Sequence, residues 1–289
     1  MESLVAEKNL EFLLHVIPPP MRLNWSTPRS LFISTFLNHI RGDKAPIGHL
    51  YVEFPLLNGD QVITGMSRNK MDVIDSIKLV QGKKLGLGTF FYDFDGKLDS
   101  VKDARDEIIW AKNKNRHASI RVSISEEKAQ KMQDFLNQWI TRGSFHHYSG
   151  GLRVAIGEGS GCAEFGMHFL GMALGLHATH PEWMRSVLVP DSLIGGGFAE
   201  HAARISVLSI LKNGNRWAHQ DESHHVYATP DPELIFDWIQ SHTAELTPEK
   251  VTWSSGKFVQ EEFKVSYPQE PLNSAQEQWA KVIEKVLEK

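Results

Sequence analysis

The sequence predicts a single α+β domain. Short segments of strand composition separated by turn residues indicate an antiparallel sheet, a long amphipathic pattern indicates a packed helix, and the only cysteine stands at the start of an apolar helical run. With 289 residues, 41% of them hydrophobic and 23% charged, the chain can bury a sizeable core. We expect residues 1–289 to form one domain, with a core at about 25–175 and a C-terminal elaboration at about 176–289.

The first third of the chain contains strand patterns around one helix pattern. Residues 10–17 are apolar and are followed by three prolines, which cannot donate to a β-ladder. Pro28 opens a helix pattern that ends near residue 41. Residues 47–54 and 61–66 have strand composition and flank a turn at Asn58-Gly59-Asp60, so we expect a hairpin.

The middle of the chain holds the most regular helix pattern. Ser125 is a helix cap, and apolar residues recur at helical spacing from there to Ile140. The preceding elements are expected at residues 71–80 (helix), 89–94 (aromatic strand), 101–112 (charged helix) and 118–124 (half-buried strand). Those that follow are a loop at 144–161, the cysteine helix to about 174, a Pro- and Gly-punctuated stretch at 181–197, an apolar segment at 202–211, and helices at 231–239 and 273–287.

Cys162 is a candidate nucleophile. Glycines at 157, 159 and 161 permit backbone with positive φ and close approach to a ligand. A thiol at a helix N-terminus meets unpaired N–H groups and the positive end of the helix dipole, which favour the thiolate. The alternative is a small buried core residue.

A nucleophilic cysteine needs a base, and His49 is our candidate among 14 histidines. A strand fixes its backbone, and Gly48 leaves one side uncrowded. The base in turn needs an orienting group. Glu53 is four strand positions away, about 13 Å, so we expect Gln61 or Thr64 on the paired strand to serve instead.

This order of elements resembles the circularly permuted branch of the papain-like superfamily, which includes NlpC-type cell-wall peptidases and lecithin:retinol-acyltransferase-like proteins. The matching pieces are Ile47-Gly48-His49-Leu50-Tyr51-Val52-Glu53, the helix capped by Ser125, and Gly161-Cys162-Ala163-Glu164-Phe165. The resemblance covers roughly residues 25 to 175. It implies an antiparallel sheet packed on a long helix and a Cys-bearing helix, with His49 as base and Cys162 as nucleophile. Gly161 departs from the Asn that is frequent there.

Other kinds of site are disfavoured. Adjacent histidines such as His146-His147 and His224-His225 point apart on a strand and lack the spacing of a structural zinc site, so no metal or cofactor is expected. The glycines before Cys162 fit neither a dinucleotide nor a phosphate loop. A net charge of −4 argues against nucleic acid, and no apolar run reaches the length of a membrane span.

We expect a cysteine-dependent hydrolase that cleaves an amide bond, with a cell-wall-type peptide as the substrate implied by the resemblance. Tyr148, Arg153, Gly161 and Glu164 are expected to contact it, with Arg153 pairing a substrate carboxylate. The alternatives are an acyltransferase or thioesterase acting on a lipid ester, and a catalytically silent fold that binds a peptide, glycan or protein. The chain would be exported if a signal peptide has been removed and cytoplasmic otherwise; the oligomeric state stays open.

Overall fold

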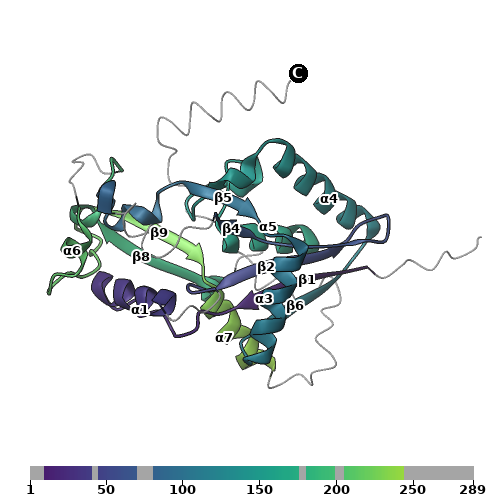
Figure 1. The fold of residues 1–289 in the computed structure, drawn as a ribbon, viewed down its shortest axis with the longest axis horizontal. Coiled ribbons are helices and arrows are strands. Elements are labelled where there is room, and N and C mark those ends of the chain that lie inside the picture. Colours follow the sequence, from purple (N-terminus) through teal and green to yellow (C-terminus); the bar gives the residue numbers. More distant parts are fainter. Residues whose placement is uncertain (1–9, 41–44, 70–80, 176–179, 199–204, 244–289) are drawn as a thin grey trace, which may run out of the picture.

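The protein is a mixed α+β structure with antiparallel sheets, as expected (Figure 1). The computed structural model describes residues 10–40, 45–69, 81–175, 180–198 and 205–243. The helices expected at 71–80 and 273–287 lie outside these residues.

A four-stranded antiparallel sheet forms the centre of the molecule. Its strands are β1 (Leu10–Ile17), β2 (His49–Pro55), β3 (Gln61–Thr64) and β6 (Ala118–Ile124), in the order β3-β2-β1-β6. Leu14 stands opposite Val52 on one side and Ile120 on the other. β1 is therefore an inner strand, and the predicted pairing of residues 47–54 with 61–66 is present in β2 and β3.

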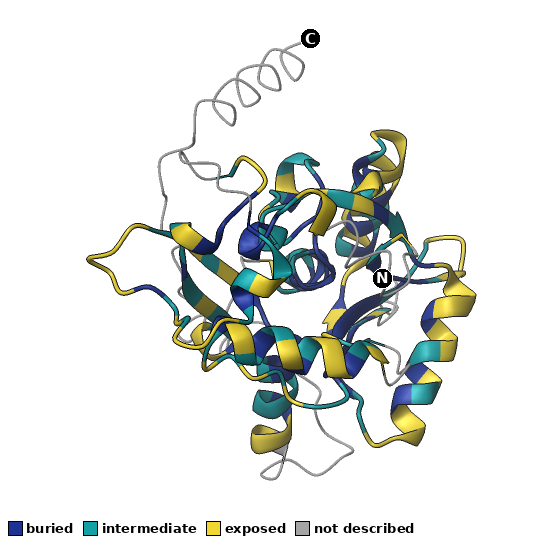
Figure 2. Cartoon of the chain, turned by 60° about the vertical axis from the view of Figure 1, so that its left-hand side comes forward, coloured by how far each residue is buried: buried dark blue, intermediate teal, exposed yellow. Residues whose placement is uncertain are grey.

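Helices cover both faces of this sheet (Figures 1 and 2). On one face Phe12, Leu14, Leu50 and their neighbours form the main core with α4 (Glu126–Thr141) and α5 (Cys162–Leu174). On the other face α3 (Val101–Asn113) packs on Tyr51. Successive side chains of a strand point to opposite faces of the sheet, so the same strands contact α4 and α5 on one face and α3 on the other.

Two of the helix starts follow from their sequences. The Ser125 side chain accepts a hydrogen bond from the Lys128 N–H, and Ser100 caps α3 in the same way through the Asp103 N–H. Such caps satisfy N–H groups that have no partner within the helix.

A second antiparallel sheet, in the order β4-β5-β7, lies beside the first. Its strands are β4 (Met66–Arg68), β5 (Phe94–Leu98) and β7 (His147–Tyr148). The single strand expected at 61–66 is broken at Gly65, where a Cβ would lie 2.8 Å from the Leu50 carbonyl oxygen. The aromatic strand expected at 89–94 is wrong, because a 3₁₀ turn occupies Leu87–Phe90 and the strand begins at Phe94.

The C-terminal elements belong to the same packed body. β8 (Met184–Pro190) and β9 (His224–Pro230) form an antiparallel pair. This pair was not expected from the Pro- and Gly-rich sequence of 181–197. β9 contacts α5, and α7 (Pro232–Thr243) contacts β1 and β6. The other elements are α1 (Pro28–Ile40), α6 (Val207–Ile210), and 3₁₀ turns at Ser144–His146, Val154–Ile156, Pro181–Trp183 and Asp191–Leu193.

Candidate functional site

Cys162 is the first residue of α5 and is 6% exposed. The loop before it turns through Gly157 and Gly159, whose φ angles of 78° and 130° favour glycine as expected. A Cβ on Gly159 would also meet His147 at 2.4 Å. Gly161, in contrast, has extended backbone with a φ of −76°, a conformation that does not require glycine.

The structure brings His49 to Cys162. His49 begins β2 directly after Gly48, which has a φ of 85°, and the ring is buried against Tyr51 with centroids 4.4 Å apart. Burial alone would lower the pKa of His49. The negative charges of Cys162 and Asp99, and the close contacts of the ring with both side chains, instead raise that pKa well above 6.5. The His49 ring is therefore held in its protonated form beside the sulfur.

Asp99 lies where an orienting group is needed, next to His49, and sequence reasoning missed it. Its Oδ2 lies 3.3 Å from Nε2 of His49. That nitrogen makes no well-aligned hydrogen bond, so we describe the contact as an ion pair. Ser67 donates to the same carboxylate at 2.6 Å, and Lys97 lies 3.3 Å from it. Burial would raise the pKa of Asp99, but its bonds to His49 and Ser67 and the charges of His49 and Lys97 lower it.

Neither expected orienting residue contacts His49. Thr64 donates to the backbone oxygen of Asp99 at 2.9 Å, so it positions the segment that carries the carboxylate. Gln61 is exposed and stands opposite Pro55, at the other end of β2 from His49. The strand pairing that we used to select these residues is present, but the small second sheet places Asp99 closer.

Tyr148, expected to contact substrate, lies directly against the cysteine. Burial, the negative charge of Cys162, a hydrogen bond to its side chain and the charge of Glu164 raise the pKa of Tyr148 well above 10, while a hydrogen bond from the Cys162 backbone N–H opposes the rise. The hydroxyl is thus held in its neutral form, beside both the sulfur and the first N–H of α5.

Arg153 has a different partner from the one we expected. Its guanidinium binds Glu158 through Nη2 at 2.6 Å and Nε at 3.1 Å and 3.2 Å. This pair, together with the Arg153 N–H on the Glu158 carboxylate, closes the loop before Cys162. Arg153 is not among the residues that line the pocket next to Cys162, so in this structure it supports the loop.

Glu164 and Gly161 form one unit at the start of α5. The Thr229 hydroxyl donates to Oε1 of Glu164 at 2.5 Å. A Cβ on Gly161 would come within 2.5 Å of Oε2 of Glu164, which explains the glycine. Burial raises the pKa of Glu164 to about 7, although the hydrogen bonds from Thr229 and from its own backbone act to lower it.

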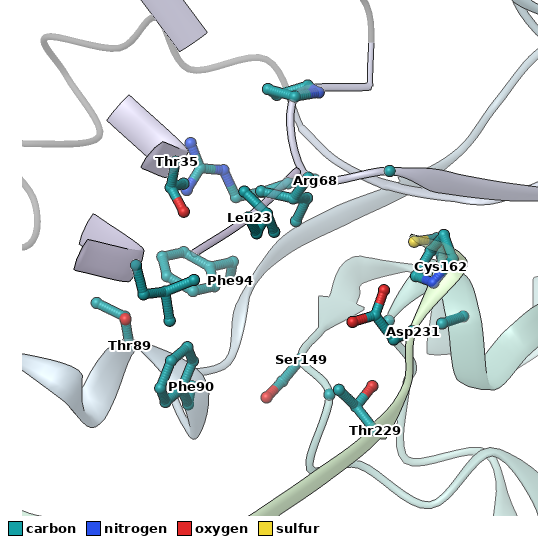
Figure 3. A pocket seen from close by; sticks show the side chains of 18 of the residues that line it. Leu23, Thr35, Arg68, Thr89, Phe90, Phe94, Ser149, Cys162, Thr229 and Asp231 are labelled. Atoms are coloured by element: carbon teal, nitrogen blue, oxygen red, sulfur yellow. The ribbon is translucent and has the colours of Figure 1, made fainter. Parts of the chain in front are cut away.

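Cys162, His49, Tyr148 and Glu164 all line one pocket with a volume of about 640 Å³. Figure 3 shows Phe90 and Phe94 across this pocket from Cys162, Thr229 and Asp231. The volume lies in the usual range for sites that hold a small organic ligand. Most of the wall is apolar, contributed by Leu23, Trp25, Pro28, Leu31, Phe32, Phe36, Pro46, Ile47, Leu87, Phe90, Phe94, Val207, Ile210, Tyr227, Pro230 and Pro232.

Within the residues that the structure describes, no group of three His, Cys, Asp or Glu side chains is placed to hold a metal ion. His147 pairs with Asp93 at 2.6 Å and His225 with Asp191 at 2.7 Å. None of the described helices combines the length and apolar character needed to cross a membrane.

Comparison of the chain with protein-family models, with curated proteins and with solved structures finds no match. The site is therefore interpreted from its own geometry.

Proposed function

We propose that this protein is a cysteine-dependent hydrolase that cleaves an amide bond. The observation that carries the proposal is the buried row of Cys162, His49 and Asp99 beside a pocket large enough for a ligand. A nucleophile, a base in contact with it and a third group that orients the base are the parts that thiol hydrolysis requires.

In the proposed reaction the Cys162 thiolate attacks the carbonyl carbon, forming an S–C bond while the carbonyl electron pair moves to oxygen. Asp99 pairs with Nε2 of His49, which leaves Nδ1 for the thiol and the leaving group. The imidazolium gives its proton to the amide nitrogen as the C–N bond breaks. Water, deprotonated by His49, then attacks the thioester carbonyl and releases the acid and the thiolate.

The oxyanion needs donors close to the sulfur. The backbone N–H of Cys162 at the α5 N-terminus is one, and the neutral Tyr148 hydroxyl beside it is the second. The raised pKa of Tyr148 keeps its proton available for donation at neutral pH.

A peptide remains the substrate that the resemblance implies. The apolar wall favours a second candidate, an ester or thioester of an apolar acyl group, because such a wall gains free energy by removing hydrocarbon from water. Both candidates use the same nucleophile and differ in the acyl group and the leaving atom.

The test combines thiol reactivity with turnover. Cys162 is the only cysteine, so alkylation by iodoacetamide reports on it alone. At pH 6 we expect alkylation at least about tenfold faster than that of a free thiol such as glutathione, and a large loss of that advantage in His49→Ala. Peptides containing D-amino acids and acyl esters of increasing chain length are then assayed, with Cys162→Ala as the inactive control.

Turnover of either series that disappears in both Cys162→Ala and His49→Ala supports the proposal and identifies the substrate series. Alkylation no faster than that of glutathione, with the rate unchanged in His49→Ala, would overturn it and favour a silent binding fold.

A further inference from the structure

We propose that Glu164, Tyr227 and Tyr148 form a subsite for an organic ammonium group next to Cys162. The inference rests on the proposed function in one respect, since it assigns the ammonium group to the substrate of that hydrolase. The subsite itself can be tested without turnover.

The carboxyl group of Glu164 is held in place in the pocket wall by neighbouring elements. It comes from the first turn of α5, two residues after the nucleophile, and receives the Thr229 hydroxyl from β9. Gly161 makes room for it, because a Cβ there would be 2.5 Å from Oε2. In this position of the carboxylate, residue 161 has no space for a side chain.

No cation among the described residues pairs with this carboxylate. Arg68, which also lines the pocket, lies over the Phe94 ring at 5.0 Å, and Arg185 binds Asp231 at 2.8 Å. Burial raises the pKa of Glu164 to about 7, and no neighbouring positive charge lowers it. A half-buried carboxylate whose partners are one hydroxyl and its own backbone N–H has lost part of its hydration without gaining a counter-charge, and a cationic ligand would supply that charge.

Aromatic rings beside the carboxylate favour an organic cation. The Tyr227 hydroxyl lies close to Gly150, where a Cβ would be 3.1 Å from it, and the Tyr227 ring stacks on Phe90 with centroids 4.4 Å apart. Tyr148 approaches from β7, and all three rings line the pocket. Ring faces attract alkylammonium groups, and the attraction is larger where water is excluded.

The charged and titratable groups that face Glu164 come from three elements. Cys162 lies on α5 itself, Tyr148 on β7, and Tyr227 on β9, where Asp231 follows. Burial and the negative charges of Glu164, Cys162 and Asp231 all raise the pKa of Tyr227. The surroundings thus favour added positive charge.

Two methanethiosulfonate reagents that differ by one atom test the subsite. One carries a trimethylammonioethyl group and the other the isosteric, neutral 3,3-dimethylbutyl group. With either, the Cys162 thiolate attacks the sulfenyl sulfur, a mixed disulfide forms, and methanesulfinate leaves with the electron pair of the broken S–S bond. The ratio of the two rates cancels changes in thiolate content.

We expect the cationic reagent to react at least about tenfold faster at pH 8.5. The preference should fall as the pH drops through about 7, because Glu164 becomes neutral there. Glu164→Gln should abolish it, whereas Glu127→Gln, the same charge change at an exposed site at the start of α4, should retain it.

A rate ratio near one in the wild-type protein, or a preference equal in Glu164→Gln, would overturn the subsite. The wild-type pH series alone decides the matter if Glu164→Gln does not fold. A cation preference without hydrolysis of any substrate would support the subsite while refuting the proposed function, so the two failures are distinguishable.

Discussion

At the scale of single residues, Asp99 controls the protonation of His49. Its close contact with Nε2 and its negative charge are two of the causes that raise the pKa of His49. In the proposed reaction the imidazolium donates a proton to the leaving group, and this form exists below that raised pKa and is lost as the pH rises through it. The basic limb of a pH–rate profile should therefore report on Asp99.

Asp99→Asn should move the basic limb of kcat/KM to lower pH, because two causes of the raised His49 pKa are removed. The measurement is kcat/KM, or the alkylation rate of Cys162, across pH 6 to 10. Asp60→Asn is the matched control, since it makes the same change at an exposed residue in the turn between β2 and β3 and should leave the limb in place. An unmoved limb in Asp99→Asn would exclude Asp99 from the mechanism.

At the scale of elements, the position of Cys162 depends on how closely α5 approaches the central sheet. Gly166 faces β1 and β2, and a Cβ there would meet Leu14 Cδ1 and Leu50 Cβ at 3.0 Å each. The helix lies near the sheet because this position has no side chain. The same approach brings the first turn of α5 to His49 at the start of β2.

Gly166→Val should destabilise the fold by about 1–3 kcal/mol, the usual cost of overpacking a filled core. Gly82→Val is the control, because among the described residues no atom other than those of the adjoining chain lies within 4 Å of a Cβ at the exposed Gly82. Urea denaturation compares the two variants with the wild type. If Gly166→Val were as stable as Gly82→Val, the close helix–sheet approach would not be required.

At the scale of the whole molecule, a polar row of buried His15 with half-buried His117 and Glu53 links stability to pH. His15 joins His117 at 3.0 Å and Glu53 at 2.9 Å across β1, β2 and the start of β6. Burial and the positive charges of His15 and Lys112 lower the pKa of His117 to about 3. In the unfolded chain that ring would bind a proton near pH 6.5.

The unfolded state therefore binds more protons than the folded state between about pH 6.5 and 3, so stability contributed by neutral His117 is present above pH 6.5 and is lost as the pH falls. His117→Gln, which keeps a hydrogen-bonding group, should lose less unfolding free energy between pH 7 and 5 than the wild type. The difference should be about 1 kcal/mol after allowing for partial exposure. Equal losses in urea titrations at the two pH values would contradict this account.

Much of the fold follows from local patterns in the sequence. An apolar run stopped by three prolines predicted β1, alternation of polar and apolar residues predicted β6, and helical spacing with the Ser125 cap predicted α4. β8 and β9 were missed because turn residues dominate the sequence at 181–197, while their pairing joins segments about 40 residues apart. Local propensity carries no information on such a pairing.

For the candidate site, the sequence alone singled out Cys162 and His49, which the structure places next to each other. A lone cysteine after spaced glycines at a helix start, and a histidine after Gly48 at a strand start, are local features that need no knowledge of the fold. The third residue was decided by tertiary structure, because Asp99 reaches His49 only where the chain crosses at Gly65 into the second sheet. Tertiary structure likewise decided the surroundings of Glu164, since burial and the contact with Thr229 on β9 exist only once distant segments pack together.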